Sequence, residues 1–352
     1  MSRRWVSLWL TLSLFGLAGG LLAWTLARVR WQETWLAFRS LELWELALWA
    51  SLNLSLVALF SGRWWFLLRL QSLQVPFFPL VLYRLAGFGL SYLTPGPQFG
   101  GEGWLVVLLQ RRHAVPPMEG SISVVMDKLI ELLANFSFLA FGLLVSLHFG
   151  LPQTMLSTAL TVPLIALLSV PFLLFGLLAG GILPASWLVE RASRAPKFWL
   201  KLLQVFSDAE RRSATLIRRH LWALAAVYLY SLGTWLVMVG EYWLMLHILG
   251  FDLNLPQALF SLTAARLAFL TPLPGGLGAL EAAQVTALQV LGFSASIGFS
   301  LSVMQRVRDL LLATLGIVLG SLFHIRPRPA LKPMAGLEAF PPSSLPLQER
   351  DP

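Results

Sequence analysis

The chain of 352 residues contains no cysteine, and charged residues make up only 12% of it, about half of their usual share. The absence of cysteine excludes a disulfide framework, a thiolate nucleophile and an iron–sulfur site. A soluble fold covers its surface with charge, so the scarcity of charge excludes an ordinary cytosolic enzyme. Hydrophobic residues reach 57% instead. The composition therefore predicts an all-α polytopic membrane protein.

Motifs of catalysis and metal binding are also missing. There is no Walker loop, no GxSxG elbow and no aspartate-rich transferase motif, and no two histidines have the HExxH spacing. We therefore expect no catalytic residue, no metal and no cofactor. The net charge of +9 does not form a basic stripe interleaved with aromatics on a soluble domain, so we expect no nucleic-acid partner. The five histidines are scattered: His113, His148, His220, His247 and His324.

Long apolar runs, each sufficient to cross about 30 Å of hydrocarbon, predict six full transmembrane helices. The first follows two arginines but is too long for a signal-peptide core, so it is expected to stay uncleaved. The polar, proline-rich segment 326–352 is expected to be a disordered cytoplasmic tail. The predicted spans are 5–27, 43–61, 117–149, 155–180, 221–249 and 294–323.

Two further stretches, 76–112 and 254–292, consist of short apolar segments separated by a break rich in proline and glycine. Such breaks persist at membrane depth only where protein or a water-filled cavity satisfies the freed backbone groups. We expect each stretch to be a re-entrant hairpin of two half-helices. The alternative is a pair of full, tilted helices joined by a loop.

The distribution of basic residues predicts the orientation of the chain. Segment 181–220 holds eight basic residues against three acidic ones, so we expect this connection to be cytoplasmic. Counting spans from it places both chain termini, together with Arg63 and Arg69 after the second span, in the cytoplasm. The same count opens the first hairpin to the cytoplasm and the second to the outside.

The two broken stretches share a sequence. LTPGP at 93–97 is followed by two glycines and Glu102, and LTPLP at 270–274 is followed by glycines and Glu281. With the predicted orientation this is an inverted-topology repeat, in which substrate sites form at the midplane between discontinuous helices. The expected organisation is one domain, 1–325, with repeat 1 over about 43–149 and repeat 2 over about 221–323.

Half-helices that begin after glycines direct backbone N–H groups toward the break and suit an anionic group such as a lipid phosphate. The alternative is that these turns only end helices. The residues expected at a head-group site are Thr94, Gly100, Gly101, Glu102, Asp127, Arg266, Thr271, Gly275, Gly276, Glu281, Arg306 and Arg308.

Charged residues also occur inside the long apolar segments. Asp127 and Arg306 each stand 25 residues after the glutamate of their repeat. A charge near the bilayer centre costs at least ~2.5–3.5 kcal/mol, so it normally has a partner. We expect Asp127 and Arg306 to pair with each other or to line a central cavity together. The alternative is that such charges are structural ion pairs. Arg84 and Glu241 are further intramembrane candidates.

The stretches LTPGPQFGGEGWLVVLLQRR, MDKLIELL and LTPLPGGLGALEAAQVTALQVLG resemble the lysylphosphatidylglycerol synthase transmembrane region, a family also described as flippase-like integral membrane proteins. The resemblance implies a multi-pass inner-membrane protein. In two-domain members of the family it implies movement of an aminoacylated phospholipid between leaflets. Only 29 residues follow Phe323, so we expect no soluble synthase domain and no synthase activity.

The resulting hypothesis is a translocase that moves a phospholipid or a polyprenyl-linked anionic lipid across the cytoplasmic membrane. Two alternatives stay open: a membrane-embedded transferase acting on a lipid phosphate, and an accessory subunit of an envelope glycosyltransferase. The expected partners are a membrane phospholipid or polyprenyl-phosphate lipid, and a second copy of the chain or an envelope-synthesis enzyme.

Overall fold

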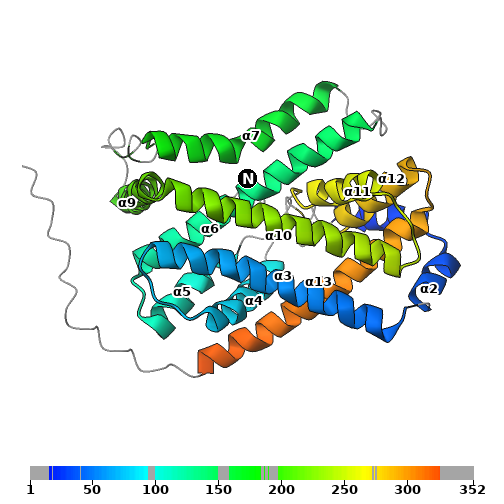
Figure 1. Ribbon diagram of the computed structural model, residues 1–352, viewed down its shortest axis with the longest axis horizontal. Coiled ribbons are helices and arrows are strands. Elements are labelled where there is room, and N and C mark those ends of the chain that lie inside the picture. Colours follow the sequence, from blue (N-terminus) through cyan, green and yellow to red (C-terminus); the bar gives the residue numbers. More distant parts are fainter. Residues whose placement is uncertain are drawn as a thin grey trace, which may run out of the picture.

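The structure, a computed structural model, consists of helices throughout the part it describes (Figure 1). The described residues are 16, 17, 19–39, 41–93, 100–149, 158–183, 186, 189, 197–271, 273 and 276–325. The all-helical prediction is confirmed for these residues. The predicted tail 326–352 and most of the first predicted span lie outside them.

The long helices form the body of the molecule, and α3, α6 and α10 pack against one another. These three are long and apolar enough to cross a membrane. The six-plus-two arrangement of full spans and re-entrant hairpins stays a prediction. The helices are α2 (Trp31–Arg39), α3 (Leu43–Leu70), α4 (Phe77–Leu93), α5 (Glu102–His113), α6 (Pro117–His148), α7 (Thr158–Gly180), α9 (Lys197–Arg219), α10 (Leu221–Ile248), α11 (Leu255–Ala268), α12 (Ala279–Val290) and α13 (Ala295–Ile325).

One helix is longer than the sequence pattern predicted. The second span was expected to end at residue 61, but α3 continues to Leu70. Arg63 is therefore not in a cytoplasmic loop: it lies within the helix, and its side chain is only 2% exposed. The helix tolerates this charge because two carboxylates of α6 neutralise it.

Both predicted breaks are present as short helix pairs. The four helices have 17, 12, 14 and 12 residues, fewer than the ~20 that cross a bilayer. Glycines permit the tight geometry. A Cβ on Gly101 would lie 2.1 Å from the carbonyl oxygen of Gly87, and Gly276 and Gly278 have φ of 64° and 76°. Each pair thus folds back within a short distance, as the Pro/Gly pattern predicted.

The two halves exchange their short helices. Helix α4 packs on α13, the long helix of the second half, and α11 packs on α6, the long helix of the first. Both contacts require glycine. A Cβ on Gly316 would lie 1.9 Å from the carbonyl oxygen of Leu85, and a Cβ on Gly142 would lie 2.0 Å from Oγ1 of Thr263. Such reciprocal packing is what a two-fold relation between halves produces, while their inversion relative to a membrane stays a prediction.

Candidate functional site

A cavity of about 490 Å³ lies between the exchanged helices. Its wall is divided in character. Apolar side chains of α3, α4, α6 and α13 line one part, whereas the short helices and the middles of α6 and α13 supply charged groups. The charged lining residues are Arg84, Glu102, Lys128, Glu131, Arg266, Arg308 and Asp309.

A buried ion-pair cluster supports the wall where α3, α4 and α6 meet. Arg63 donates through Nε to Asp127 at 2.7 Å and through a terminal nitrogen to Glu131 at 2.9 Å. Arg84 donates to the other carboxylate oxygen of Asp127, also at 2.7 Å, and to the backbone oxygen of Phe60. Its buried Nε has no partner among the described residues. The first half therefore places two arginines around one aspartate.

The expected pair between Asp127 and Arg306 is wrong. Arg306 donates instead to Glu281, at 2.8 Å through Nε, and to the backbone oxygen of Gly276 at 2.9 Å. The charges are nearly buried on both sides. The physical reason is local: the second hairpin folds directly onto the long helix that follows it, so its own glutamate reaches Arg306 first.

The equivalent contact in the first half involves the next residue along α6. Lys128 lies 3.7 Å from Glu102 of the first hairpin and 2.9 Å from Glu131. Glu102 also accepts a hydrogen bond from the backbone N–H of Gly100. In both halves, then, the hairpin glutamate meets a cation on the following long helix. The repeated spacing of 25 residues is explained by these pairs within each half.

A fourth group joins α3, α10 and α13. Arg308 donates to Asp309 at 3.0 Å and to Glu241 at 3.3 Å. Glu241 also accepts hydrogen bonds from the indole of Trp49 and the amide of Asn53. Glu241 is thus satisfied by three donors, which stabilises a carboxylate in an apolar core.

Arg266 differs from the other lining cations because it forms no ion pair with a described residue. Its guanidinium lies 5.1 Å from the ring centre of Trp235 and 5.9 Å from that of Phe269, and one nitrogen contacts the sulfur of Met238. Aromatic faces attract a cation but leave its charge uncompensated. Arg266 therefore presents the cavity with a cation that an anionic group can neutralise.

The structure brings some predicted site residues to the cavity and leaves others behind its wall. Gly101, Glu102, Arg266 and Arg308 line it. Asp127, Glu281 and Arg306 are held in ion pairs outside the lining, and Gly100, Thr271 and Gly276 lie at the breaks. Thr94 and Gly275 lie outside the described residues.

Sequence reasoning missed one central residue, Arg63, because the span was ended at the first charge. The apolar letters WWFLL that follow it were the signal that the helix continued. Lys128 and Glu131 were noticed only as loose matches to the charges of the second repeat. Over the described ranges, no group of three or more histidine or acidic side chains is placed to hold a metal ion.

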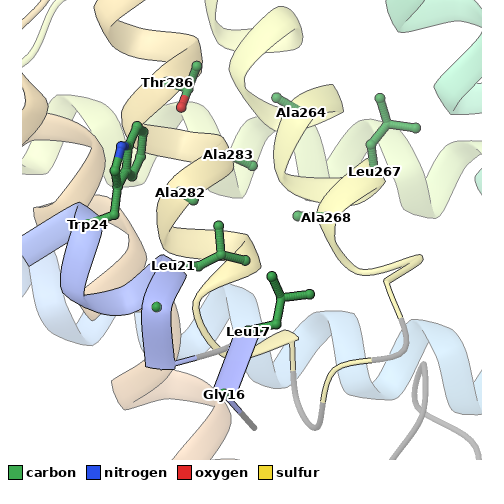
Figure 2. Close-up of a pocket in the computed structure, with 11 residues that line it drawn as sticks. Gly16, Leu17, Leu21, Trp24, Ala264, Leu267, Ala268, Ala282, Ala283 and Thr286 are labelled. Atoms are coloured by element: carbon green, nitrogen blue, oxygen red, sulfur yellow. The ribbon is translucent and has the colours of Figure 1, made fainter. Parts of the chain in front are cut away.

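A second hollow, of about 730 Å³, is an apolar groove on the other side of α11 (Figure 2). Figure 2 shows side chains of the N-terminal segment facing small residues of α11 and α12. No charged residue lines it, so it suits only apolar chains. The lining residues are Gly16, Leu17, Gly20, Leu21, Trp24, Ala264, Leu267, Ala268, Ala282, Ala283 and Thr286.

Comparisons with known proteins agree on a membrane family. The model of the family described as "Lysylphosphatidylglycerol synthase TM region" matches residues 8–316. The UPF0104 membrane protein PH1989 of Pyrococcus horikoshii is 23% identical over 295 residues, which cover 78% of this chain and 84% of that protein. No solved structure matches the chain.

Proposed function

The chain belongs to the lysylphosphatidylglycerol synthase TM region family, and from this premise we propose that it is a lipid translocase of the cytoplasmic membrane. The cargo is an anionic lipid, either a phospholipid or a polyprenyl-linked phosphate. Its head group crosses through the cavity between the exchanged helices while its tails stay in the bilayer. In this proposal both chain termini are cytoplasmic.

The observation that carries the proposal is the divided wall of the cavity. A volume of about 490 Å³ lies within the range of small-molecule sites. One part of the wall offers Arg84, Arg266 and Arg308, and another offers apolar side chains such as Phe60, Phe88 and others of the long helices. A molecule with an anionic head and an apolar body matches both parts.

Arg266 is the primary phosphate contact in this account. It already lies in the cavity wall without a carboxylate, so binding an anion there breaks no existing ion pair. The partnerless Nε of Arg84 supplies a second donor. Charge-assisted hydrogen bonds to phosphate are about twice as strong as neutral ones, which favours an anionic head group over a neutral one.

The hairpin glutamates act as gates. The contact between Glu102 and Lys128 is long, at 3.7 Å, whereas that between Lys128 and Glu131 is 2.9 Å. Lys128 therefore releases Glu102 at low cost and keeps Glu131. Opening this contact frees the start of α5, while the shorter pair between Glu281 and Arg306 keeps the second hairpin closed. Alternation of the two contacts exposes the cavity to one side at a time.

The experiment is a translocation assay with purified protein in liposomes that contain a head-labelled anionic lipid. The expected result is that the fraction of label accessible to an impermeant quencher rises with time beyond half, and that protein-free liposomes do not show this. Mass spectrometry of the same lipid separates the alternatives. An unmodified mass supports translocation, whereas a changed head group indicates a transferase. Absence of both activities favours an accessory role beside an envelope-synthesis enzyme.

A further inference from the structure

Helix α9 has one basic face. Arg211, Arg212, Arg218 and Arg219 are all exposed, and so is Thr215 between them. Their spacing of three and four residues places them along one side of the helix. The positions of Lys197 and Lys201 continue the same register. Four exposed arginines thus form a stripe along a single helix.

The opposite face of α9 is buried against the bundle. Ala214 and Ile217 pack with residues of α6, α7 and α10 in a common apolar cluster. Two of the arginines also tie the helix in place. Arg212 forms an ion pair with Glu119 of α6, and Arg218 donates to the backbone oxygen of Ala179 at the end of α7. The basic face is therefore held in a fixed direction relative to the bundle.

The position of α9 matches the level of a membrane surface. Figure 1 shows α9 nearly end-on while α10 extends along its length, so α9 runs across the ends of the long helices. Directly after it, Trp222 begins α10 with 87% of its surface exposed. Exposed tryptophans mark the level of lipid head groups. The arginines next to Trp222 consequently lie at head-group depth.

We propose that the exposed face of α9 binds the anionic phospholipid surface of the leaflet at this end of the bundle. Arg211 and Arg219 provide the main contacts, because neither is held by a carboxylate of the described residues and both are exposed. Arg212 and Arg218 fix the helix. This surface is separate from the cavity, and its role does not depend on lipid translocation.

The test uses the full chain in vesicles and exploits the absence of cysteine. A single Thr215→Cys substitution carries a fluorophore at the centre of the stripe. Quenching by brominated phosphatidylglycerol or brominated phosphatidylcholine, each diluted in unbrominated phosphatidylcholine, gives the relative affinity of the two lipids beside α9. The same measurement with the label at Gln204→Cys, also exposed on this face, shows whether the label itself perturbs binding.

The expected ratio favours phosphatidylglycerol, and Arg211→Gln/Arg219→Gln lowers it by up to about fivefold for each arginine removed. Raising the salt to about 1 M, where the Debye length is about 3 Å, brings the ratio of the parent protein toward one. The control Arg28→Gln/Arg39→Gln removes the same charge from exposed positions far from α9 in sequence and should leave the ratio unchanged. A ratio near one in the parent, or no change in the α9 double variant, overturns the proposal.

Discussion

Arg63 of α3 and Asp127 of α6 are joined by a 2.7 Å ion pair that is almost completely buried. The pair connects the first long helix to the helix that supplies two charged groups, Lys128 and Glu131, to the cavity wall. Removing one partner of a buried pair typically costs ~3–5 kcal/mol, because it leaves an uncompensated charge. The shape of the cavity therefore depends on a residue that does not line it.

The first prediction concerns this pair. Arg63→Ala should lower the thermal stability of the purified protein strongly, with a loss near the lower end of ~3–5 kcal/mol because Arg84 still neutralises Asp127. Thermal unfolding followed by size-exclusion chromatography measures the loss. Arg219→Ala, which removes an exposed arginine, is the matched control and should change stability by less than about 0.5 kcal/mol. Equal midpoints for the two variants would contradict the central role of Arg63.

The second prediction distinguishes the true partner of Arg306. A double-mutant cycle of Glu281→Ala and Arg306→Ala should show a coupling energy within ~0.5–3 kcal/mol, because their side chains are in contact. A cycle of Asp127→Ala and Arg306→Ala should be additive to within about 0.5 kcal/mol. Coupling in the second cycle that exceeds the first would restore the pair expected from sequence.

The third prediction concerns the exchange of short helices. Gly316→Ala should destabilise the protein, since its new Cβ would overlap the backbone of α4 at Leu85. Neither backbone can move aside without separating α4 from α13. Gly240→Ala is the control, because no atom lies within 4 Å of a Cβ built there, and alanine favours a helix by roughly 1 kcal/mol. Stability measurements that rank Gly316→Ala above Gly240→Ala would refute the close packing.

A fourth prediction concerns pH at the start of the chain. Hydrogen bonds from Arg30 and then from Ser294 hold the pKa of Glu33 below its ordinary value. A carboxyl with a depressed folded-state pKa contributes stability above its unfolded-state pKa and loses it as the pH falls through the folded value. The melting midpoint of the parent should therefore fall at acidic pH, and part of this dependence should vanish in Glu33→Gln. An identical pH profile for the two proteins would show that the contact between α2 and Ser294 contributes nothing.

Local patterns predicted the helices and breaks because apolar length, proline and glycine determine them within a few residues. The repeat was visible for the same reason, since LTPxP and the following glutamate recur at similar spacing. Partner choice was not visible. Arg63 and Asp127 are brought together by the crossing of α3 and α6, and nothing in either segment alone encodes that crossing. The intervals of 25 residues were correct, but sequence assigned their residues to the wrong partners.

The aromatic surroundings of Arg266 show the same limit. Sequence placed this arginine near the second break, yet its lack of a carboxylate depends on α10, which contributes Trp235 and Met238. A cation without an acidic partner is recognised only when every helix around it is in place. That property, more than its position beside the break, makes it the residue on which the proposed function depends.

The most direct measurement is the rate of anionic-lipid translocation in liposomes that contain Arg266→Gln. The variant keeps a polar side chain and breaks no ion pair of the described residues, so it should fold, and its melting midpoint should stay near that of the parent. Arg219→Gln, outside the cavity, serves as the control and should translocate at the parental rate. The account predicts that Arg266→Gln loses at least about tenfold in rate, the equivalent of one charge-assisted hydrogen bond of about 1.4 kcal/mol or more. Folded Arg266→Gln protein that moves the lipid as fast as the parent would contradict it.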